Sequence, residues 1–234
     1  LCVQIAWAYM DAGKTDESES YLREAEECLR ESPDEMIVVE ESQFKTLSAR
    51  IVIARAYNAQ AKGEVSATVK YAEEALRLIP EENQFMRAQS TAILAGAHWA
   101  NGELSAAFDA MNTWMEQARR SGNVVFAIMT AHGLADILTA QGRLRDAVKM
   151  YTDSLQFAAS VGMDDTPFTA HHHLGLAMLF HEMNDGAMDD HLQKGLALGQ
   201  GSTIVDWAYR RNLAQARLKE TYGEFDAALE FLEE

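Results

Sequence analysis

Proline, cysteine and glycine are all scarce in this sequence. Its 234 residues include 3 prolines, 2 cysteines and 14 glycines, whereas alanine, leucine, glutamate and methionine abound. Because the abundant residues form helices well and the scarce ones interrupt them, the composition favours an all-helical fold. Two cysteines, Cys2 and Cys28, are too few for a disulfide framework, and we expect two buried thiols in a reducing cytosol.

Basic residues are also in short supply. Twenty Lys and Arg face 36 Asp and Glu, which gives a formal net charge of −16. A protein that grips a phosphate backbone or an anionic membrane needs an excess of positive charge, so neither partner is expected. No apolar run approaches the ~20 residues of a membrane span, and no Lys/Arg-led hydrophobic leader is present. We therefore expect a cytoplasmic protein. Helical patterns at both ends suggest a fragment of a longer chain.

Internal repetition is the strongest signal in the sequence. Five glycines stand in equivalent contexts, with an alanine-rich helical run before and after each of them. Most are separated by one or two periods of about 40 residues, a spacing typical of helical-repeat arrays. Asn184 takes the place of a missing sixth member, and the longer first interval has its excess in the acidic stretch from Ser32 to Glu41. The five are Gly13, Gly63, Gly102, Gly142 and Gly223.

Small residues recur at fixed distances from these glycines. Seven residues before the glycine, or before Asn184, stand Ala6, Ala56, Ala95, Ala135, Ala177 and Ala216. Five residues after it stand Ser18, Thr68, Ala107, Ala147 and Ala228. Small side chains at such positions let two helices cross closely, and the glycine suits the left-handed residue that ends the first helix.

These patterns predict one helical-repeat domain over residues 1–234. It is an all-α superhelix, a tetratricopeptide-like (TPR-like) solenoid of about six helical hairpins with a period of about 40 residues. The expected hairpins cover residues 1–31, 41–79, 83–120, 122–160, 166–199 and 202–234.

Five stretches carry a family resemblance. They are LCVQIAWAYMDAGKTDESESYLREAE, LRLIPEENQFMRAQSTAILAGAHWANGELSAA, GNVVFAIMTAHGLADILTAQGRLRDAVKMYTDSLQFA, HHHLGLAMLFHEMNDGAMDDHLQKGLALG and RNLAQARLKETYGEFDAALEFLEE. Together they resemble the helical-repeat region of MalT-like, ATP-dependent LuxR-family transcriptional regulators. The resemblance covers essentially the whole chain.

The resemblance implies a sensor and regulatory role. In that family the region lies between an N-terminal nucleotide-binding switch and a C-terminal DNA-binding helix-turn-helix. It senses a small-molecule effector or a partner protein and controls ATP-dependent self-association. The sequence has no GxxxxGK[ST] motif, so ATP is expected only in a flanking domain and no cofactor is expected in this chain. The alternative is a stand-alone TPR scaffold that binds proteins or peptides.

The binding residues are expected on the first helix of each hairpin, which lines the inner groove in tetratricopeptide geometry. This projection gives Trp7, Tyr57, Gln60, Trp99, His132, Asp136, His171, His181, Arg210 and Arg217. Aromatic rings beside hydrogen-bonding and charged groups suit a small molecule or a peptide. An equally strong interpretation is that Trp7 and Trp99 simply pack between helices.

Neither a metal site nor catalysis is expected. Consecutive helical residues point about 100° apart, so His171, His172 and His173 cannot converge on one ion. We expect one or two of them to face the groove while another packs inside. No Ser-His-Asp constellation, G-x-S-x-G motif or acid/base carboxylate pair is readable, so the chain is not expected to be an enzyme.

Overall fold

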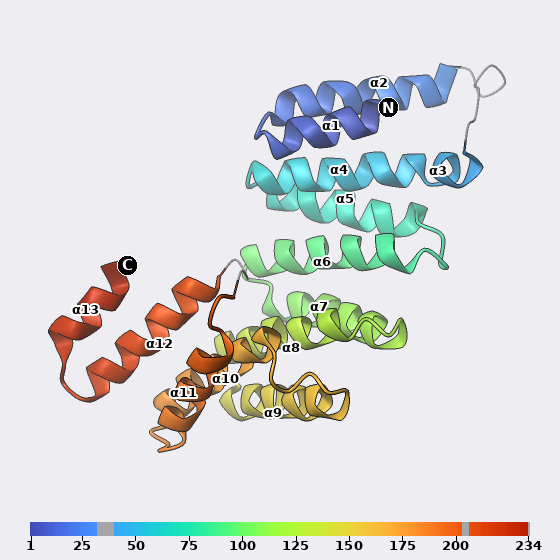
Figure 1. Cartoon of the computed structure of the whole chain (residues 1–234). Helices are drawn as coiled ribbons and strands as arrows, with labels where there is room; N and C mark the ends of the chain where they lie inside the picture. The colour runs from blue at the N-terminus through green and yellow to red at the C-terminus, as the bar shows by residue number, and fades with distance from the viewer. Residues whose placement is uncertain (32–39, 203–205, 234) are drawn as a thin grey trace. The chain divides into compact units, whose positions relative to one another are not determined.

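The computed structural model describes residues 1–31, 40–202 and 206–233, and these form thirteen α-helices and no strand. The all-helical prediction is therefore confirmed (Figure 1). The helices are α1 (Cys2–Asp11), α2 (Thr15–Glu31), α3 (Glu41–Lys45), α4 (Leu47–Ala61), α5 (Val65–Leu78), α6 (Gln84–Ala100), α7 (Leu104–Arg120), α8 (Val124–Ala140), α9 (Leu144–Ser160), α10 (Pro167–Glu182), α11 (Met188–Leu198), α12 (Trp207–Thr221) and α13 (Phe225–Glu233).

The hairpin turns follow the predicted pattern. Gly142 ends α8 at φ 73°, its N–H donates to the carbonyl of Thr139, and the Arg143 N–H donates to that of Leu138. This pair of hydrogen bonds satisfies carbonyls that the helix end would otherwise leave unpaired. The other four repeat glycines also have φ between 72° and 74°. Asn184 adopts φ 53° in the fifth turn, as predicted for the residue that replaces glycine.

The small residues that flank the turns are all buried. The alanines seven residues before each turn and the Ser, Thr or Ala residues five residues after it lie at 0–9% exposure. This is the burial expected of positions where two helix axes approach closely, because a larger side chain would push them apart.

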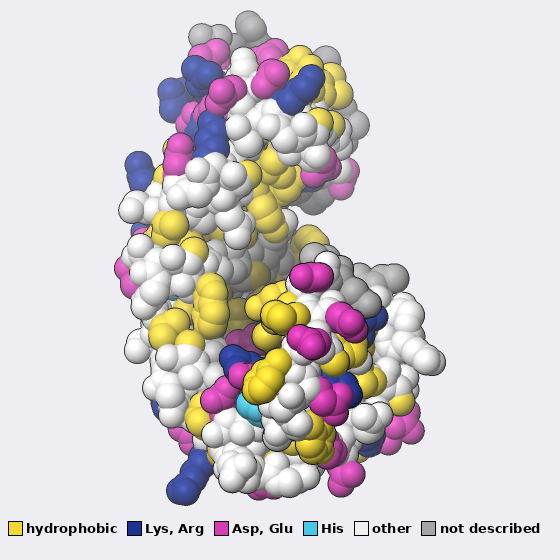
Figure 2. All heavy atoms as spheres, turned by 90° about the vertical axis from the view of Figure 1, so that its left-hand side faces the viewer, with side chains coloured by type: hydrophobic (Ala, Val, Ile, Leu, Met, Phe, Trp, Pro, Cys, Tyr) yellow, Lys and Arg dark blue, Asp and Glu magenta, His cyan; other side chains and the backbone are white. Residues whose placement is uncertain are grey.

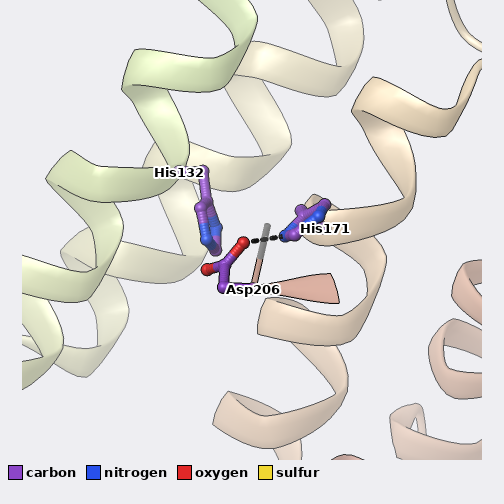
Figure 3. Close-up of side chains that lie close together, drawn as sticks. All are labelled: His132, His171 and Asp206. Carbon is purple, nitrogen blue, oxygen red and sulfur yellow. Dashed lines mark ion pairs between the residues drawn. The ribbon is translucent and has the colours of Figure 1, made fainter. Parts of the chain in front are cut away.

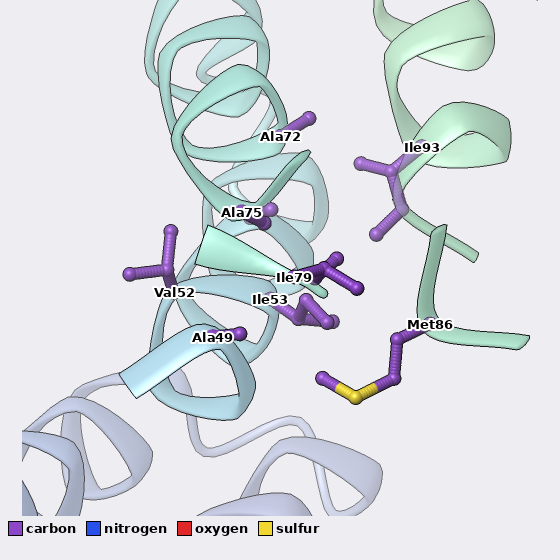
Figure 4. Packing of buried hydrophobic residues seen from close by; sticks show 9 residues of the cluster. Ala49, Val52, Ile53, Ala72, Ala75, Ile79, Met86 and Ile93 are labelled. Atoms are coloured by element: carbon purple, nitrogen blue, oxygen red, sulfur yellow. The ribbon is translucent and has the colours of Figure 1, made fainter. Parts of the chain in front are cut away.

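The chain divides into two compact units, Leu1–Gln117 and Ala118–Glu234, with the boundary inside α7. In unit 1, the first helices of successive hairpins, α1, α4 and α6, pack on one another in order. One core cluster joins α4, α5 and α6 through residues such as Ile53, Ala72, Ile79 and Ile93 (Figure 4). Each hairpin of unit 1 thus buries its apolar face on its neighbour.

Basic side chains of α4 and of Lys62, the residue just after it, form ion pairs with acidic side chains of α2. The Arg55 guanidinium pairs with Glu19 at 3.1 Å and with Glu26 at 3.0 Å, and Lys62 pairs with Asp16 at 2.7 Å. The acidic stretch that lengthens the first repeat falls mostly on residues 32–39, which lie outside the described residues.

Unit 2 repeats this arrangement, with α10 packed on both α8 and α12. A buried cluster that includes Leu174, Leu192 and Trp207 joins α10, α11 and α12. Tyr151 of α9 is fully buried against α10 and faces Gly175. The first helices of three successive hairpins are therefore neighbours in unit 2 as well.

The expectation of two buried thiols is wrong. Both cysteines are free, Cys28 is exposed and Cys2 is only half-buried. The buried face of α2 consists of Ser18, Leu22 and Ala25, and Cys28 lies off that face in the next turn. None of the described helices combines the length and the apolar character needed to cross a membrane.

Candidate functional site

The ten predicted binding residues divide between the two units. Trp7, Tyr57, Gln60 and Trp99 belong to unit 1, and His132, Asp136, His171, His181, Arg210 and Arg217 belong to unit 2. All of them lie on first helices of hairpins, namely α1, α4, α6, α8, α10 and α12.

Unit 1 contains a pocket of about 480 Å³ across its three first helices. Trp7 of α1 is the predicted residue that lines it. The remaining lining residues are Thr46, Arg50, Ile53, Asn83, Phe85, Met86 and Gln89. Two aromatic rings, a guanidinium and two side-chain amides therefore surround a volume suited to a small organic molecule.

Tyr57 supports the pocket from outside. Its ring meets the Trp7 ring edge to face, with centroids 5.1 Å apart, and its hydroxyl accepts a hydrogen bond from the Gln89 amide at 3.4 Å. Trp7 thus packs between helices and also lines a pocket. Gln60 of α4 and Trp99 of α6 are exposed and do not line the pocket.

Arg50, Phe85 and Gln89 were not anticipated as binding residues. A signal for two of them exists in the sequence, because Gln89 follows Phe85 by one helical turn and the two side chains therefore share a face of α6. Phe85 is 78% exposed and Trp99 is 43% exposed. Spacing along α6 therefore indicated Phe85 and Gln89, whereas Arg50, on α4, joins them only through helix packing.

In unit 2, four predicted residues come together. Arg210 of α12 bridges two carboxylates: its Nη2 donates to Asp136 Oδ2 of α8 at 2.5 Å, and its Nε donates to Asp206, the residue just before α12. Burial alone would lower the pKa of Arg210, but the two carboxylates outweigh it and raise that pKa. The guanidinium therefore holds the start of α12 against α8.

Tyr151 fixes the protonation pattern beside this ion-pair network. Its hydroxyl donates to Asp136 Oδ1 at 3.2 Å and also lies 3.1 Å from His132 Nδ1. A hydroxyl has one proton, so the oxygen of Tyr151 accepts from the N–H at His132 Nδ1. Burial lowers the pKa of His132 to about 4, so the ring is neutral at pH 7. Its Nε2 is consequently an unprotonated lone pair, with no hydrogen-bond partner among the described residues.

His171 faces the same space from α10. Its side chain is 4% exposed, and neither ring nitrogen has a hydrogen-bond partner among residues 1–31, 40–202 and 206–233. Nδ1 lies 3.8 Å from Asp206 Oδ1, and the ring lies 5.1 Å from that of His132, centroid to centroid. The three side chains point toward one another in Figure 3. Burial also lowers the pKa of His171.

The other histidines of the triplet point elsewhere, as predicted for consecutive helical residues. His172 Nε2 lies 2.9 Å from Ser154 Oγ, and His173 Nδ1 lies 2.9 Å from His191 Nδ1. The expectation that one or two of the triplet face a groove is wrong, because all three are buried under neighbouring helices. On the face shown in Figure 2, histidine appears only as a small patch among acidic, basic and apolar side chains.

Two predicted residues lie apart from this cluster. His181 is half-buried near the end of α10. Arg217, on α12, pairs with Glu220 at 2.9 Å and is 42% exposed. Conversely, sequence reasoning missed Tyr151 and Asp206, which complete the cluster.

Curated relatives support the family suggested by the sequence. The chain is 25% identical over 167 residues to the HTH-type transcriptional regulator MalT of Serratia proteamaculans. The matched residues make up 71% of this chain and 18% of that protein. It is 28% identical over 147 residues to MalT of Yersinia enterocolitica, covering 63% of this chain and 16% of that protein. The matched region is therefore less than a fifth of each relative.

Solved structures support the fold. Aspartyl phosphate phosphatase F from Bacillus subtilis has a TM-score of 0.74 at 13% identity and covers 97% of this chain and 57% of its own. The apo form of RapI has a TM-score of 0.67 at 14% identity, and the match covers 98% of this chain and 93% of the RapI chain. A Podosopora anserina putative kinesin light chain with nearly identical TPR-like repeats has a TM-score of 0.65 at 18% identity, and the match covers 86% of this chain and 95% of that chain. The predicted TPR-like repeat fold is confirmed.

A family model decides the assignment. The model described as the MalT-like TPR region matches residues 49–234, which is most of the chain and includes all of unit 2. This chain belongs to the MalT-like TPR family.

Proposed function

We propose that this chain is the sensor and regulatory region of a MalT-like transcriptional regulator. It binds an effector molecule or a partner protein and thereby controls ATP-dependent self-association and transcription activation by domains elsewhere in the full protein. The observation that carries the proposal is the family match over residues 49–234. ATP belongs to a flanking domain, DNA is read by another, the location is cytoplasmic, and this region is not an enzyme.

The pocket of unit 1 is the place we assign to a small effector. Trp7 and Phe85 offer aromatic faces, and Arg50, Asn83 and Gln89 offer hydrogen bonds or charge for polar groups. Ligand pockets combine mostly apolar walls with a few polar groups in this way. Because the lining comes from α1, α4 and α6, one bound molecule contacts three hairpins.

Contact with three hairpins gives the effector a means to act. A ligand shifts a conformational equilibrium only by as much as it prefers one state over the other. A molecule held by α1, α4 and α6 favours the mutual angles of these helices that fit it best. The pocket therefore supplies the differential affinity that a regulatory switch requires.

Substitution at the pocket rim is expected to weaken effector binding by at least about tenfold, the loss of roughly 1.4 kcal/mol in contacts. Metabolites are first screened by thermal shift, and the Kd of each hit is measured by calorimetry for the wild type and for Phe85→Ala. Phe85 is 78% exposed, so its removal leaves the core intact. Tyr209→Ala, at a 69% exposed aromatic in unit 2, is the matched control.

The same ligand is also tested against Trp99→Ala and Asp136→Ala, at two other predicted binding residues. Loss of affinity only in Phe85→Ala places the effector in the unit 1 pocket. Loss only in Asp136→Ala places it in the cluster of unit 2. A validated ligand with full affinity for all of these variants would contradict binding on the first helices.

A stand-alone protein or peptide scaffold is the second candidate. Two exposed aromatic side chains on α6, Phe85 and Trp99, favour it, since exposed aromatic rings suit contact with a partner protein. The complete reading frame separates the two functions. A P-loop domain upstream and a helix-turn-helix downstream support the regulator, and a lone repeat array supports the scaffold.

A further inference from the structure

The buried cluster of unit 2 contains ring nitrogens that have no hydrogen-bond partner among the described residues. His132 Nε2 and His171 Nδ1 are two of them, and each lies 3.8 Å from a carboxylate oxygen. The Nε2 of His132 faces Asp136, and the Nδ1 of His171 faces Asp206. A buried polar nitrogen without a partner costs free energy, and at His132 the lone pair of Nε2 also faces a carboxylate, which is unfavourable unless a positive group lies between them.

Arg210 does not fill this role for the histidines. Its nitrogens donate to Asp136 and Asp206, and neither unpartnered ring nitrogen receives a hydrogen bond from it. With two carboxylates, one guanidinium and two neutral rings, the cluster has a net charge of −1. It therefore lacks one positive charge at the place where the unpartnered ring nitrogens and the Asp206 carboxylate come together.

We propose that His132, His171 and Asp206 form a binding site for a divalent transition-metal ion such as Zn²⁺, Co²⁺, Ni²⁺ or Fe²⁺. One nitrogen of each histidine and one carboxylate oxygen lie within 4.8 Å of one another. Ligand atoms about 2.0–2.2 Å from a common ion lie roughly 3–3.5 Å apart, so the side chains close by about 1.5 Å on binding. Asp206, whose side chain is 43% exposed, is the one with room to move.

The surrounding residues suit this assignment. The Tyr151 hydroxyl oxygen accepts a hydrogen bond from His132 Nδ1–H, which leaves Nε2 free to bind the ion. Arg210 binds one oxygen of Asp206 and leaves the other, Oδ1, facing His171. Groups that hold ligands in this way are a regular part of metal sites, because they fix the tautomer and the orientation. Two imidazoles and a carboxylate favour these ions over Mg²⁺ or Ca²⁺, which prefer oxygen ligands.

Three protein ligands leave one or more positions on the ion for water or another donor. The ion would also link α8 and α10 to the start of α12. The sequence predicted no metal site because His171, His172 and His173 cannot bind one ion together, and the proposed site differs in using only one of these three. Here the second histidine and the carboxylate come from other hairpins.

The test uses the full chain after treatment with a chelator. Co²⁺ is titrated and followed by its visible d–d absorption, and Zn²⁺ binding is measured by calorimetry. We expect one equivalent to bind, with affinity reduced on the order of 100-fold in Asp206→Asn and in His132→Gln, since each removes a ligand of the ion. Asp206→Asn keeps an oxygen for Arg210 and lies at a half-exposed position, so it tests the site without emptying the core.

His191→Asn is the matched control. His191 and His173 form a separate histidine pair in the same unit, so this variant should bind the ion as the wild type does. No stoichiometric uptake by the wild type would overturn the proposal. So would uptake that is unchanged in both ligand variants, or uptake abolished by His191→Asn, which would place the ion at the other pair.

Discussion

Gly175→Ala is expected to destabilise the protein by about 1–3 kcal/mol, the usual cost of forcing an extra carbon into a packed core. A Cβ at Gly175 would lie 2.3 Å from Tyr151 Cζ and 2.4 Å from its hydroxyl oxygen. Tyr151 is 1% exposed and has no free space into which to turn. The displaced hydroxyl is also the group that contacts His132 and Asp136, so the cluster of unit 2 should be disturbed as well.

Gly96→Ala is the matched control and should change stability in the opposite direction. Gly96 also lies inside a first helix, α6, but a Cβ there meets only Gln60 Nε2 at 3.5 Å, an ordinary contact. Replacing a helical glycine by alanine then gains about 0.5–1 kcal/mol, because alanine loses less backbone freedom on folding.

Urea unfolding followed by circular dichroism measures both changes. The free energies of unfolding of the two variants should lie on opposite sides of the wild-type value. If Gly175→Ala is as stable as the wild type, the tight approach of α10 to Tyr151 is wrong.

Acidification from pH 7 to pH 5 should cost the metal-free protein several kcal/mol of stability. Burial lowers the pKa of His132 to about 4, that of His172 to about 3 and that of His173 to about 4. In the unfolded chain these histidines titrate near 6.5. Between about pH 4 and pH 6.5 the unfolded state therefore binds more protons than the folded state, so stability falls as the pH falls. Each fully buried histidine contributes roughly 1–2 kcal/mol at pH 5.

The measurement is the free energy of unfolding at several pH values between 7 and 5, with a chelator present throughout. His172→Gln removes one titrating ring and retains a donor for Ser154, so its curve should be shallower than that of the wild type. The slope is the readout, whatever the variant costs at pH 7. Equal slopes for the two proteins would mean that His172 is protonated in the folded state.

The repeat was readable from the sequence because its signals are local. A glycine ends a helix through its own φ, and a small residue seven positions earlier faces the partner helix of the same hairpin. Asn184 was identifiable for the same reason, since a left-handed turn is decided by a few consecutive residues. The prediction that binding residues lie on the first helices also follows from the repeat.

The contacts among those residues were not readable in the same way. Asp206 and His171 belong to different hairpins, and Tyr151 contacts His132 and Asp136 from α9, the second helix of its hairpin, where no binding residue was expected. Sequence spacing constrains neighbours within a helix, whereas these distances depend on how successive hairpins pack. Phe85 and Arg50 became pocket residues in the same way, through the packing of α1, α4 and α6.

The sequence by itself determined the helical class, the period, the turns and the family resemblance, because each depends on residues close together in the chain. Only the tertiary structure decided that His171 turns toward His132 and Asp206 while His172 and His173 turn away. The reason is physical: a helix fixes the angle between successive side chains, but the neighbours that fill those directions come from other hairpins. The charge balance of the cluster depends on side chains up to 78 positions apart, from His132 to Arg210, and became visible only once they were packed together.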